Sequence, residues 1–235
     1  MRLLFLVLAW AAALWRAPAH ADDPGHNGAI HTAAIHLVAP APGAPGRDVA
    51  VIWLSGDGGW GRMERQMTAR LAASGVATVG FSTLEYYAKT RTPAQGAALV
   101  ARLESEAETR FGTHSFVLAG FSFGADVAPF VANALPAAMR ARLVFVTLLS
   151  PGRRASFQVG PRTWLNLQDG PEVAPEIARI APTRVLCIAN AGVFDDVCPP
   201  AGSATLRTVD LAGGHVLHNQ YDAITRAVLE EMGGR

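Results

Sequence analysis

A serine between two glycines, in GFSFG at 120–124, is the first feature of the chain whose residue types could do chemistry. Alternating apolar residues precede it, as in a strand, and the small apolar residues ADVAPF follow it. Gly-x-Ser-x-Gly between a strand and a helix is the nucleophile elbow, a sharp turn that tolerates only small flanking residues and holds the hydroxyl clear of the sheet. Ser122 is therefore the candidate nucleophile, and a tight turn with no chemistry is the alternative.

A serine hydroxyl needs a base to take its proton and an acid to hold that base in the right tautomer. In folds that use the elbow the chain order is Ser, then Asp or Glu, then His, which excludes the histidines before Ser122. His114 also stands eight residues before the serine, roughly 25 Å along a strand. His215 is the favoured base, because Gly213 and Gly214 let its loop fold back over the sheet edge. His218 is expected to cap or flank the last helix.

The acid is expected after the strand in RVLCIANAGVFDDVCP, 184–199, where Asp195 and Asp196 are the carboxylates. We favour Asp195 as the acid, with Asp196 as the alternative. Either residue could instead be a solvated loop aspartate with no role in chemistry. Cys187 and Cys198 flank the same segment, and in an oxidising compartment a disulfide between them would stiffen this loop. Two separate thiols, one of them buried in a strand, are the other possibility.

Two backbone N–H groups are needed to hold the oxyanion that forms when serine attacks a carbonyl. One is expected from Phe123, the residue after the nucleophile, and the other from the loop SGDGG at 55–59. Asp57 is our choice for the second amide, with its neighbour Gly56 as the alternative. A purely structural glycine turn is the competing interpretation of this loop.

The elements that must position these groups follow an alternating pattern. Apolar stretches typical of strands occur at 48–54, 76–81, 115–119, 143–149, 185–189 and 206–211. Helical patterns lie between them, for example after Thr92-Pro93, after Ser122 and from Gln220 onward. Such alternation predicts an α/β fold with a mostly parallel central sheet and helices on both faces. In such sheets functional groups collect at the carboxyl ends of the strands.

The N-terminus predicts export. An apolar run of about a dozen residues follows Arg2, and Ala19-His20-Ala21 resembles a cleavage site, so residues 1–21 are expected to be a signal peptide cleaved near Ala21. A retained anchor is the weaker alternative, since a spanning helix needs about 20 apolar residues. Residues 22–47 form an N-terminal segment with a possible edge strand at 30–38, and residues 48–235 form one domain.

Composition excludes several classes of function. Twenty Lys and Arg residues nearly balance nineteen Asp and Glu residues, and no basic cluster is present, so nucleic-acid binding is not expected. Two cysteines offer too few soft ligands in any known metal-binding spacing. We expect neither a metal nor another cofactor.

Six ordered motifs carry a resemblance to a known family. They are LSGDGGW at 54–60, YYAKTRTPAQ at 86–95, GFSFGADVAPF at 120–130, LLSPGRRASFQV at 148–159, GGH at 213–215 and the spaced cysteines. Together they resemble the bacterial virulence VirJ/AcvB family. The resemblance implies an α/β-hydrolase fold, a periplasmic location and hydrolysis of the aminoacyl ester of lysyl-phosphatidylglycerol. It also implies a rival role as a non-catalytic periplasmic binding or chaperone protein linked to type IV secretion and virulence.

This resemblance suggests how the substrate is held. The expected partners are an aminoacylated phospholipid at the membrane surface and components of type IV secretion. Asp57 would receive the lysyl ammonium, and Lys89 and Arg91 would face the lipid phosphate, unless they are ordinary solvated basic residues. Aromatic residues that could line an apolar opening for acyl chains, or simply be core, are Trp60, Tyr86, Tyr87 and Phe121.

Overall fold

The sheet determines where every functional group of this protein lies. The computed structural model describes residues 34–165, 167, 169–190, 192, 196, 198–200 and 204–233. The predicted signal peptide and the first part of the N-terminal segment lie outside these residues. The seven strands have the order β1-β3-β2-β4-β5-β6-β7. They are β1 (Ile35–Val38), β2 (Val49–Leu54), β3 (Ala77–Phe81), β4 (Ser115–Phe121), β5 (Leu143–Leu149), β6 (Arg184–Ala189) and β7 (Leu206–Asp210).

All neighbouring strands are parallel except the pair at one edge, where β1 runs antiparallel to β3. The central strands β2 and β4 are continuous apolar runs because helices cover them from both sides. The predicted mostly parallel sheet is therefore confirmed. Since the parallel strands all end at one edge, the loops that follow β2, β4, β5, β6 and β7 meet there.

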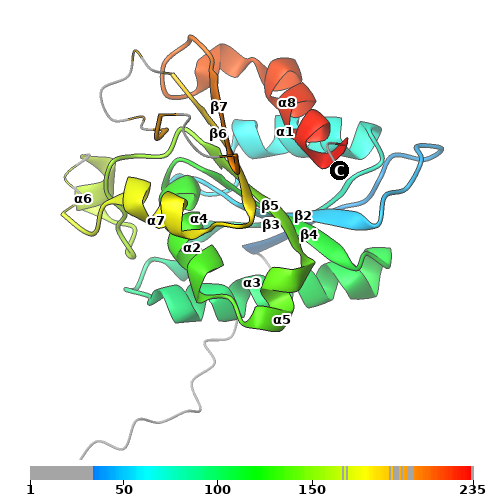
Figure 1. Cartoon of the computed structure of the whole chain (residues 1–235), viewed down its shortest axis with the longest axis horizontal. Coiled ribbons are helices and arrows are strands. Elements are labelled where there is room, and N and C mark those ends of the chain that lie inside the picture. Colours follow the sequence, from blue (N-terminus) through cyan, green and yellow to red (C-terminus); the bar gives the residue numbers. More distant parts are fainter. Residues whose placement is uncertain are drawn as a thin grey trace, which may run out of the picture. The chain divides into compact units, whose positions relative to one another are not determined.

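Helices cover both faces of the sheet (Figure 1). Helices α1 and α8 pack together over one face, and α4 packs against both α3 and α7 on the other. The helices are α1 (Arg62–Ala73), α2 (Thr83–Tyr86), α3 (Pro93–Phe111), α4 (Phe123–Ala134), α5 (Ala137–Arg142), α6 (Pro161–Trp164), α7 (Val173–Arg179) and α8 (Tyr221–Gly233), with a 3-10 turn η2 (Leu217–Asn219). In the described part of the chain, none of them has the length and apolar character needed to cross a bilayer.

The ends of α3 illustrate how local sequence fixes an element. The Thr92 hydroxyl accepts a hydrogen bond from the Gln95 amide at 3.2 Å, and the Gln95 side chain accepts one from the Thr92 amide at 2.9 Å. Pro93 fills the first helical position, where its missing N–H is not needed. Gly112 ends the helix with φ 67°, a left-handed conformation that glycine adopts without strain.

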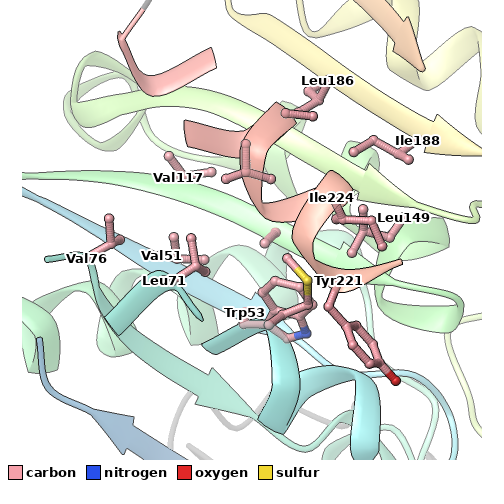
Figure 2. Packing of buried hydrophobic residues seen from close by; sticks show 14 of the residues in the cluster. Val51, Trp53, Leu71, Val76, Val117, Leu149, Leu186, Ile188, Tyr221 and Ile224 are labelled. Carbon is pink, nitrogen blue, oxygen red and sulfur yellow. The ribbon is translucent and has the colours of Figure 1, made fainter. Parts of the chain in front are cut away.

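The core between the sheet and helices α1 and α8 follows the alternation of the strands (Figure 2). Val51 and Trp53 in β2, and Leu186 and Ile188 in β6, are two residues apart and so point to the same face. Helix α8 covers them with a stripe of apolar residues that includes Ile224. Fully burying such a side chain contributes roughly 1.5–3 kcal/mol, so this layer holds the strand ends rigidly for the loops they carry.

Candidate active site

Ser122 sits in a sharp turn where β4 meets α4. Its backbone has φ 53° and ψ −121°, outside the regions that non-glycine residues normally occupy. Two hydrogen bonds hold this conformation, from the Ser122 amide to the Leu149 carbonyl at 2.9 Å and from the Asp126 amide to the Ser122 carbonyl at 3.0 Å. The turn is the elbow geometry that the sequence motif predicts.

The two glycines of the motif are required by the closeness of the backbone. A Cβ on Gly120 would lie 2.3 Å from the Gly124 carbonyl oxygen, and a Cβ on Gly124 would lie 2.3 Å from the Leu54 carbonyl oxygen. Real Cβ atoms do not come so near to backbone atoms, and the backbone at these points cannot move aside. The motif is thus explained by contacts between β4, α4 and the end of β2.

His215 joins the serine to a carboxylate. Its Nε2 lies 2.8 Å from Ser122 Oγ, and its Nδ1 lies 2.6 Å from Asp196 Oδ1. An ionised carboxylate only accepts hydrogen bonds, so Nδ1 carries the proton and donates it to Asp196. That tautomer leaves Nε2 free to accept the hydroxyl proton of Ser122, as a general base requires.

The carboxylate at this position belongs to Asp196, not to the aspartate favoured from the sequence. Asp195 lies outside the described residues, whereas the Asp196 side chain is 1% exposed and bonded to the imidazole. The buried Asp196 carboxylate binds one side of the His215 ring, and the ring itself is half-exposed. Asp196 is therefore the carboxylate that orients the imidazole.

A disulfide joins Cys187 in β6 to Cys198, eleven residues later in the chain. This bond confirms the predicted pairing, and the two cysteines are not separate thiols. The loop it closes contains Asp196, so the chain carrying the carboxylate is anchored to the sheet at both ends.

The pKa of His215 is raised above its ordinary value. The hydrogen bond to Asp196 is the main cause, because it favours the protonated ring. Burial acts in the opposite direction, and the nearby carboxyls of Asp126 and Asp57 add to the rise. Three carboxyl groups, from two loops and helix α4, thus favour the protonated imidazole when they are ionised.

The loop that carries His215 depends on its two glycines. Gly213 has φ 128° and Gly214 has φ 69°, and a Cβ on Gly213 would lie 2.5 Å from the His218 amide. His218 itself is exposed in the turn before α8, and its amide donates to the Gly213 carbonyl at 2.9 Å. The structure thus brings His215 to the serine and places His218 beside the last helix.

The loop after β2 lies directly against the nucleophile. A Cβ on Gly56 would be 3.5 Å from the Ser122 Cβ. The amide of Gly56, however, donates to Glu64 Oε1 at 3.2 Å, so it is not free to hold an oxyanion, and this alternative from the sequence is wrong. In the described part of the chain, the amides of Phe123 and Asp57 donate to no carbonyl or side-chain oxygen.

Of the predicted aromatic residues, the structure brings Phe121 to the site. Its ring lies 5.6 Å from the His215 ring, centroid to centroid. Tyr87 is fully buried against Phe123, so its expected place in an opening for acyl chains is wrong. Trp60 stacks on His36 at 4.3 Å, where it packs over the β1–β3 edge of the sheet.

The predicted phosphate-facing residues, Lys89 and Arg91, lie between α2 and α3. Lys89 is exposed. Arg91 is held by its own neighbours, since its Nε donates to the Tyr86 carbonyl at 3.0 Å and its guanidinium lies 4.4 Å from the centre of the Tyr86 ring. Tyr86 in turn donates from its hydroxyl to the Gln95 carbonyl. Arg91 and Tyr86 therefore form one structural unit with the start of α3.

Sequence reasoning missed three polar residues of the site. Asp126 is 3% exposed and accepts a hydrogen bond from the Gly152 amide, and burial raises its pKa to about 7. Ser150 is fully buried and donates to the His215 carbonyl. Glu64 accepts from the amides of Gly56 and Gly61 and so holds the loop after β2. For Asp126 the sequence does contain a signal, because a carboxylate in an otherwise apolar helix indicates a buried polar contact.

Metal ligands do not gather at this site. Across the residues that the structure describes, no group of three or more His, Cys, Asp or Glu side chains could hold a metal ion.

The sheet order, the elbow and the loops at one sheet edge define an α/β-hydrolase fold. The chain belongs to the VirJ family: the family described as bacterial virulence protein (VirJ) matches residues 48–235. This confirms the family resemblance seen in the sequence. A comparison with curated protein sequences gives no match.

Solved structures of low sequence identity share the fold. A putative non-heme bromoperoxidase, BpoC, from Mycobacterium tuberculosis H37Rv is 15% identical with a TM-score of 0.62, covering 86% of this chain and 95% of that one. Est1E from Butyrivibrio proteoclasticus is 16% identical with a TM-score of 0.57, covering 85% and 94%. An α/β serine hydrolase homologue from Coxiella burnetii is 14% identical with a TM-score of 0.55, covering 83% and 89%.

Proposed function

We propose that this protein is a serine ester hydrolase that cleaves the aminoacyl ester of lysyl-phosphatidylglycerol or a related aminoacylated lipid. The observation that carries the proposal is the continuous chain of hydrogen bonds from Ser122 Oγ through His215 to Asp196. Membership of the VirJ family supports the lipid substrate only through the resemblance described above.

In the proposed reaction Ser122 attacks the aminoacyl carbonyl while His215 Nε2 takes the hydroxyl proton. Asp196 stabilises the imidazolium that forms, and the amides of Phe123 and Asp57 hold the oxyanion. His215 then gives the proton to the leaving glycerol oxygen of the lipid, and an acyl-enzyme remains. Water, activated by the same imidazole, attacks the acyl-enzyme and releases the amino acid.

The charge around the site supports a cationic acyl group. Asp57, Asp126 and Asp196 all lie close enough to act on the charge of His215. Carboxylates near the reacting carbonyl favour an ammonium on the substrate and disfavour an anionic acyl group. Asp57 is partly exposed in the loop beside the serine, so we assign it the contact with the lysyl ammonium.

The proposed location is the periplasm, after removal of residues 1–21. The Cys187–Cys198 disulfide supports an oxidising compartment, because such bonds are rare in the reducing cytosol. The proposed lipid would be reached at the membrane surface, and components of type IV secretion are the proposed protein partners.

A comparison of substrates tests the proposal. Purified protein is incubated with vesicles containing lysyl-phosphatidylglycerol, alanyl-phosphatidylglycerol or unmodified phosphatidylglycerol, with a short-chain ester and with a peptide. Release of lysine from the first lipid by the wild type, and none by Ser122→Ala, is the expected result. Asp57→Asn should narrow the preference for lysyl over alanyl lipid. Binding of the lipid without cleavage of any ester would instead support the non-catalytic role linked to secretion.

A further inference from the structure

The segment from Leu149 to Gly152, at the end of β5, contacts each of the elements that carry the proposed catalytic residues. The Leu149 carbonyl accepts from the Ser122 amide at 2.9 Å. The Ser150 amide donates to the Ile188 carbonyl at 2.8 Å, on the strand that leads to Asp196. This segment thus connects the nucleophile turn to the strand before the acid.

Ser150 extends the connection to the histidine. Its Oγ donates to the backbone carbonyl of His215 at 2.8 Å, a contact between residues 65 positions apart. The side chain is fully buried, and its backbone has φ 49°, a conformation that few non-glycine residues adopt. Unfavourable backbone conformations persist where the surrounding structure demands them, and here the conformation aims the hydroxyl at the histidine loop.

Asp126, in helix α4, binds the segment 149–152 at Gly152. It lies one helical turn after Ser122, and its Oδ1 accepts from the Gly152 amide at 2.6 Å. A Cβ on Gly152 would lie 3.3 Å from that oxygen, so the approach is already close. The carboxyl is 3% exposed, and the proposed mechanism gives it no proton to transfer.

We propose that Ser150 and Asp126 are positioning residues that keep His215 at bonding distance from Ser122 through the segment 149–152. The proposal rests on the proposed serine hydrolase function. The loop of His215 contains two consecutive glycines with positive φ, and the backbone hydrogen bonds from the amides of Leu217 and His218 to the carbonyls of Gly214 and Gly213 lie within the loop itself. The hydrogen bond from Ser150 Oγ joins the His215 carbonyl to the end of β5, outside this loop, and so positions the imidazole relative to Ser122.

Asp126 has an electrostatic effect as well as a mechanical one. The charged and titratable groups that act on its carboxyl are His215, Asp57 and Asp196, from the loops after β7, β2 and β6. An ionised Asp126 stabilises the imidazolium and so raises the pKa of His215. The mechanical contact needs only an acceptor for the Gly152 amide, whereas the electrostatic effect needs the charge.

Two pairs of variants separate these effects. Ser150→Ala removes the hydrogen bond to the His215 carbonyl, and Thr147→Val is its matched control, because Thr147 is a buried residue of β5, three positions before Ser150, whose hydroxyl has no partner among the described residues. Asp126→Asn keeps an acceptor for Gly152 and removes the charge, while Asp126→Ala removes both. Activity on a short-chain ester, the rate of fluorophosphonate labelling of Ser122 and the melting temperature are measured for each.

We expect Ser150→Ala and Asp126→Ala to lower kcat by roughly 10- to 100-fold with KM within about twofold, and to slow labelling in parallel. Thr147→Val should keep the wild-type rates. Asp126→Asn should keep most of the labelling rate at high pH but shift the acidic limb of kcat/KM to lower pH. Rates of Ser150→Ala equal to those of Thr147→Val would overturn the proposal. A loss in kcat that is fully explained by a lower melting temperature of Ser150→Ala would also overturn it.

A spectroscopic measurement keeps the test independent of turnover. The proton between His215 Nδ1 and Asp196 should give a low-field proton resonance in NMR spectra, identified by its loss in His215→Ala. Ser150→Ala should broaden or shift this resonance and Thr147→Val should not. If the wild type cleaves no ester and is not labelled, the proposed function fails, while the resonance still decides whether Ser150 positions the ring.

Discussion

His215 Nε2 lies 2.8 Å from Ser122 Oγ, although 93 residues separate the two in the chain. Ser122→Ala should lower turnover by about 10⁴- to 10⁶-fold, because no other group at the turn replaces the attacking oxygen. The variant should melt within a few degrees of the wild type. A serine-directed fluorophosphonate should label the wild type at Ser122 and fail on the variant, as mass spectrometry of the peptide would reveal.

The two histidines of the last loop provide a matched comparison. His215→Ala should abolish turnover as completely as the serine variant, since the base and the nucleophile act as one unit. His218→Ala should keep near-wild-type turnover, because its exposed side chain stands beside α8 and not at the serine. The reverse pattern would transfer the base role to His218 and remove the main support for the mechanism.

Asp196 should behave differently from its neighbour Asp195. Asp196→Asn should lower kcat by about 10⁴-fold, because an amide no longer fixes the tautomer with a proton on Nδ1. The hydrogen bond that raises the pKa of His215 is weakened as well. In the wild type kcat/KM is expected to rise as the imidazole loses its proton, through a pKa that lies above the ordinary value for histidine. Any remaining activity of Asp196→Asn should rise at lower pH than this.

Asp195→Asn is the control, with expected turnover close to that of the wild type. Measuring kcat/KM from pH 5 to 9 for the three proteins checks both statements. A large loss in Asp195→Asn with little effect in Asp196→Asn would return the acid role to Asp195.

The meeting of Ser122 and His215 was predictable because the sequence signals around each residue are local. Gly120 and Gly124 mark the turn around Ser122, and Gly213 and Gly214 mark the loop of His215. The parallel sheet was likewise predictable from the alternation of apolar strands and helical patterns.

The acid could not be chosen in the same way. Asp195 and Asp196 are adjacent, and which carboxylate meets the imidazole depends on the path of the loop backbone. The sequence also offers Gly56 as an oxyanion donor, but its amide is bonded to Glu64, a contact that no local motif indicates. The contact of Asp126 with Gly152 joins residues 26 positions apart, so it follows from packing and not from any motif.

The Cys187–Cys198 bond should contribute to stability and to turnover. Joining two cysteines eleven positions apart restricts the unfolded chain, an effect of about 3 kcal/mol in loop-entropy arguments. Reduction should therefore lower the melting temperature by roughly 5–10 °C. It should also lower kcat, because the loop carries Asp196 and a displaced carboxylate no longer orients His215.

Calorimetry and ester turnover with and without a reducing agent measure both effects. The double variant Cys187→Ala with Cys198→Ala is the control, since a reductant should change neither quantity in it. Full activity of the reduced wild type would show that the disulfide does not hold the acid. Free thiols in protein taken from the exported fraction would contradict the proposed compartment.

Asp126 should make stability depend on pH. Burial raises the pKa of its carboxyl from 3.8 to about 7 in the folded protein. Below pH 4 both folded and unfolded chains carry the proton, and this group has no pH-dependent effect. Between about pH 4 and 7 the unfolded chain loses the proton first, so the free energy of unfolding falls by up to about 1.4 kcal/mol per pH unit. Above pH 7 the carboxyl is ionised in both the folded and the unfolded chain, and the free energy of unfolding falls no further through this group.

Asp126→Asn cannot ionise at this position, so its stability relative to the wild type should increase steadily from pH 4 to 7 and then stay constant. Denaturant unfolding at several pH values measures this difference, which includes the effect of Asp126 on the pKa of His215. Thr147→Val changes no titratable group and should follow the wild-type slope. Parallel curves for the wild type and Asp126→Asn would mean that Asp126 is already ionised at pH 4 in the folded state, and its carboxyl would then act on His215 with full charge at every higher pH.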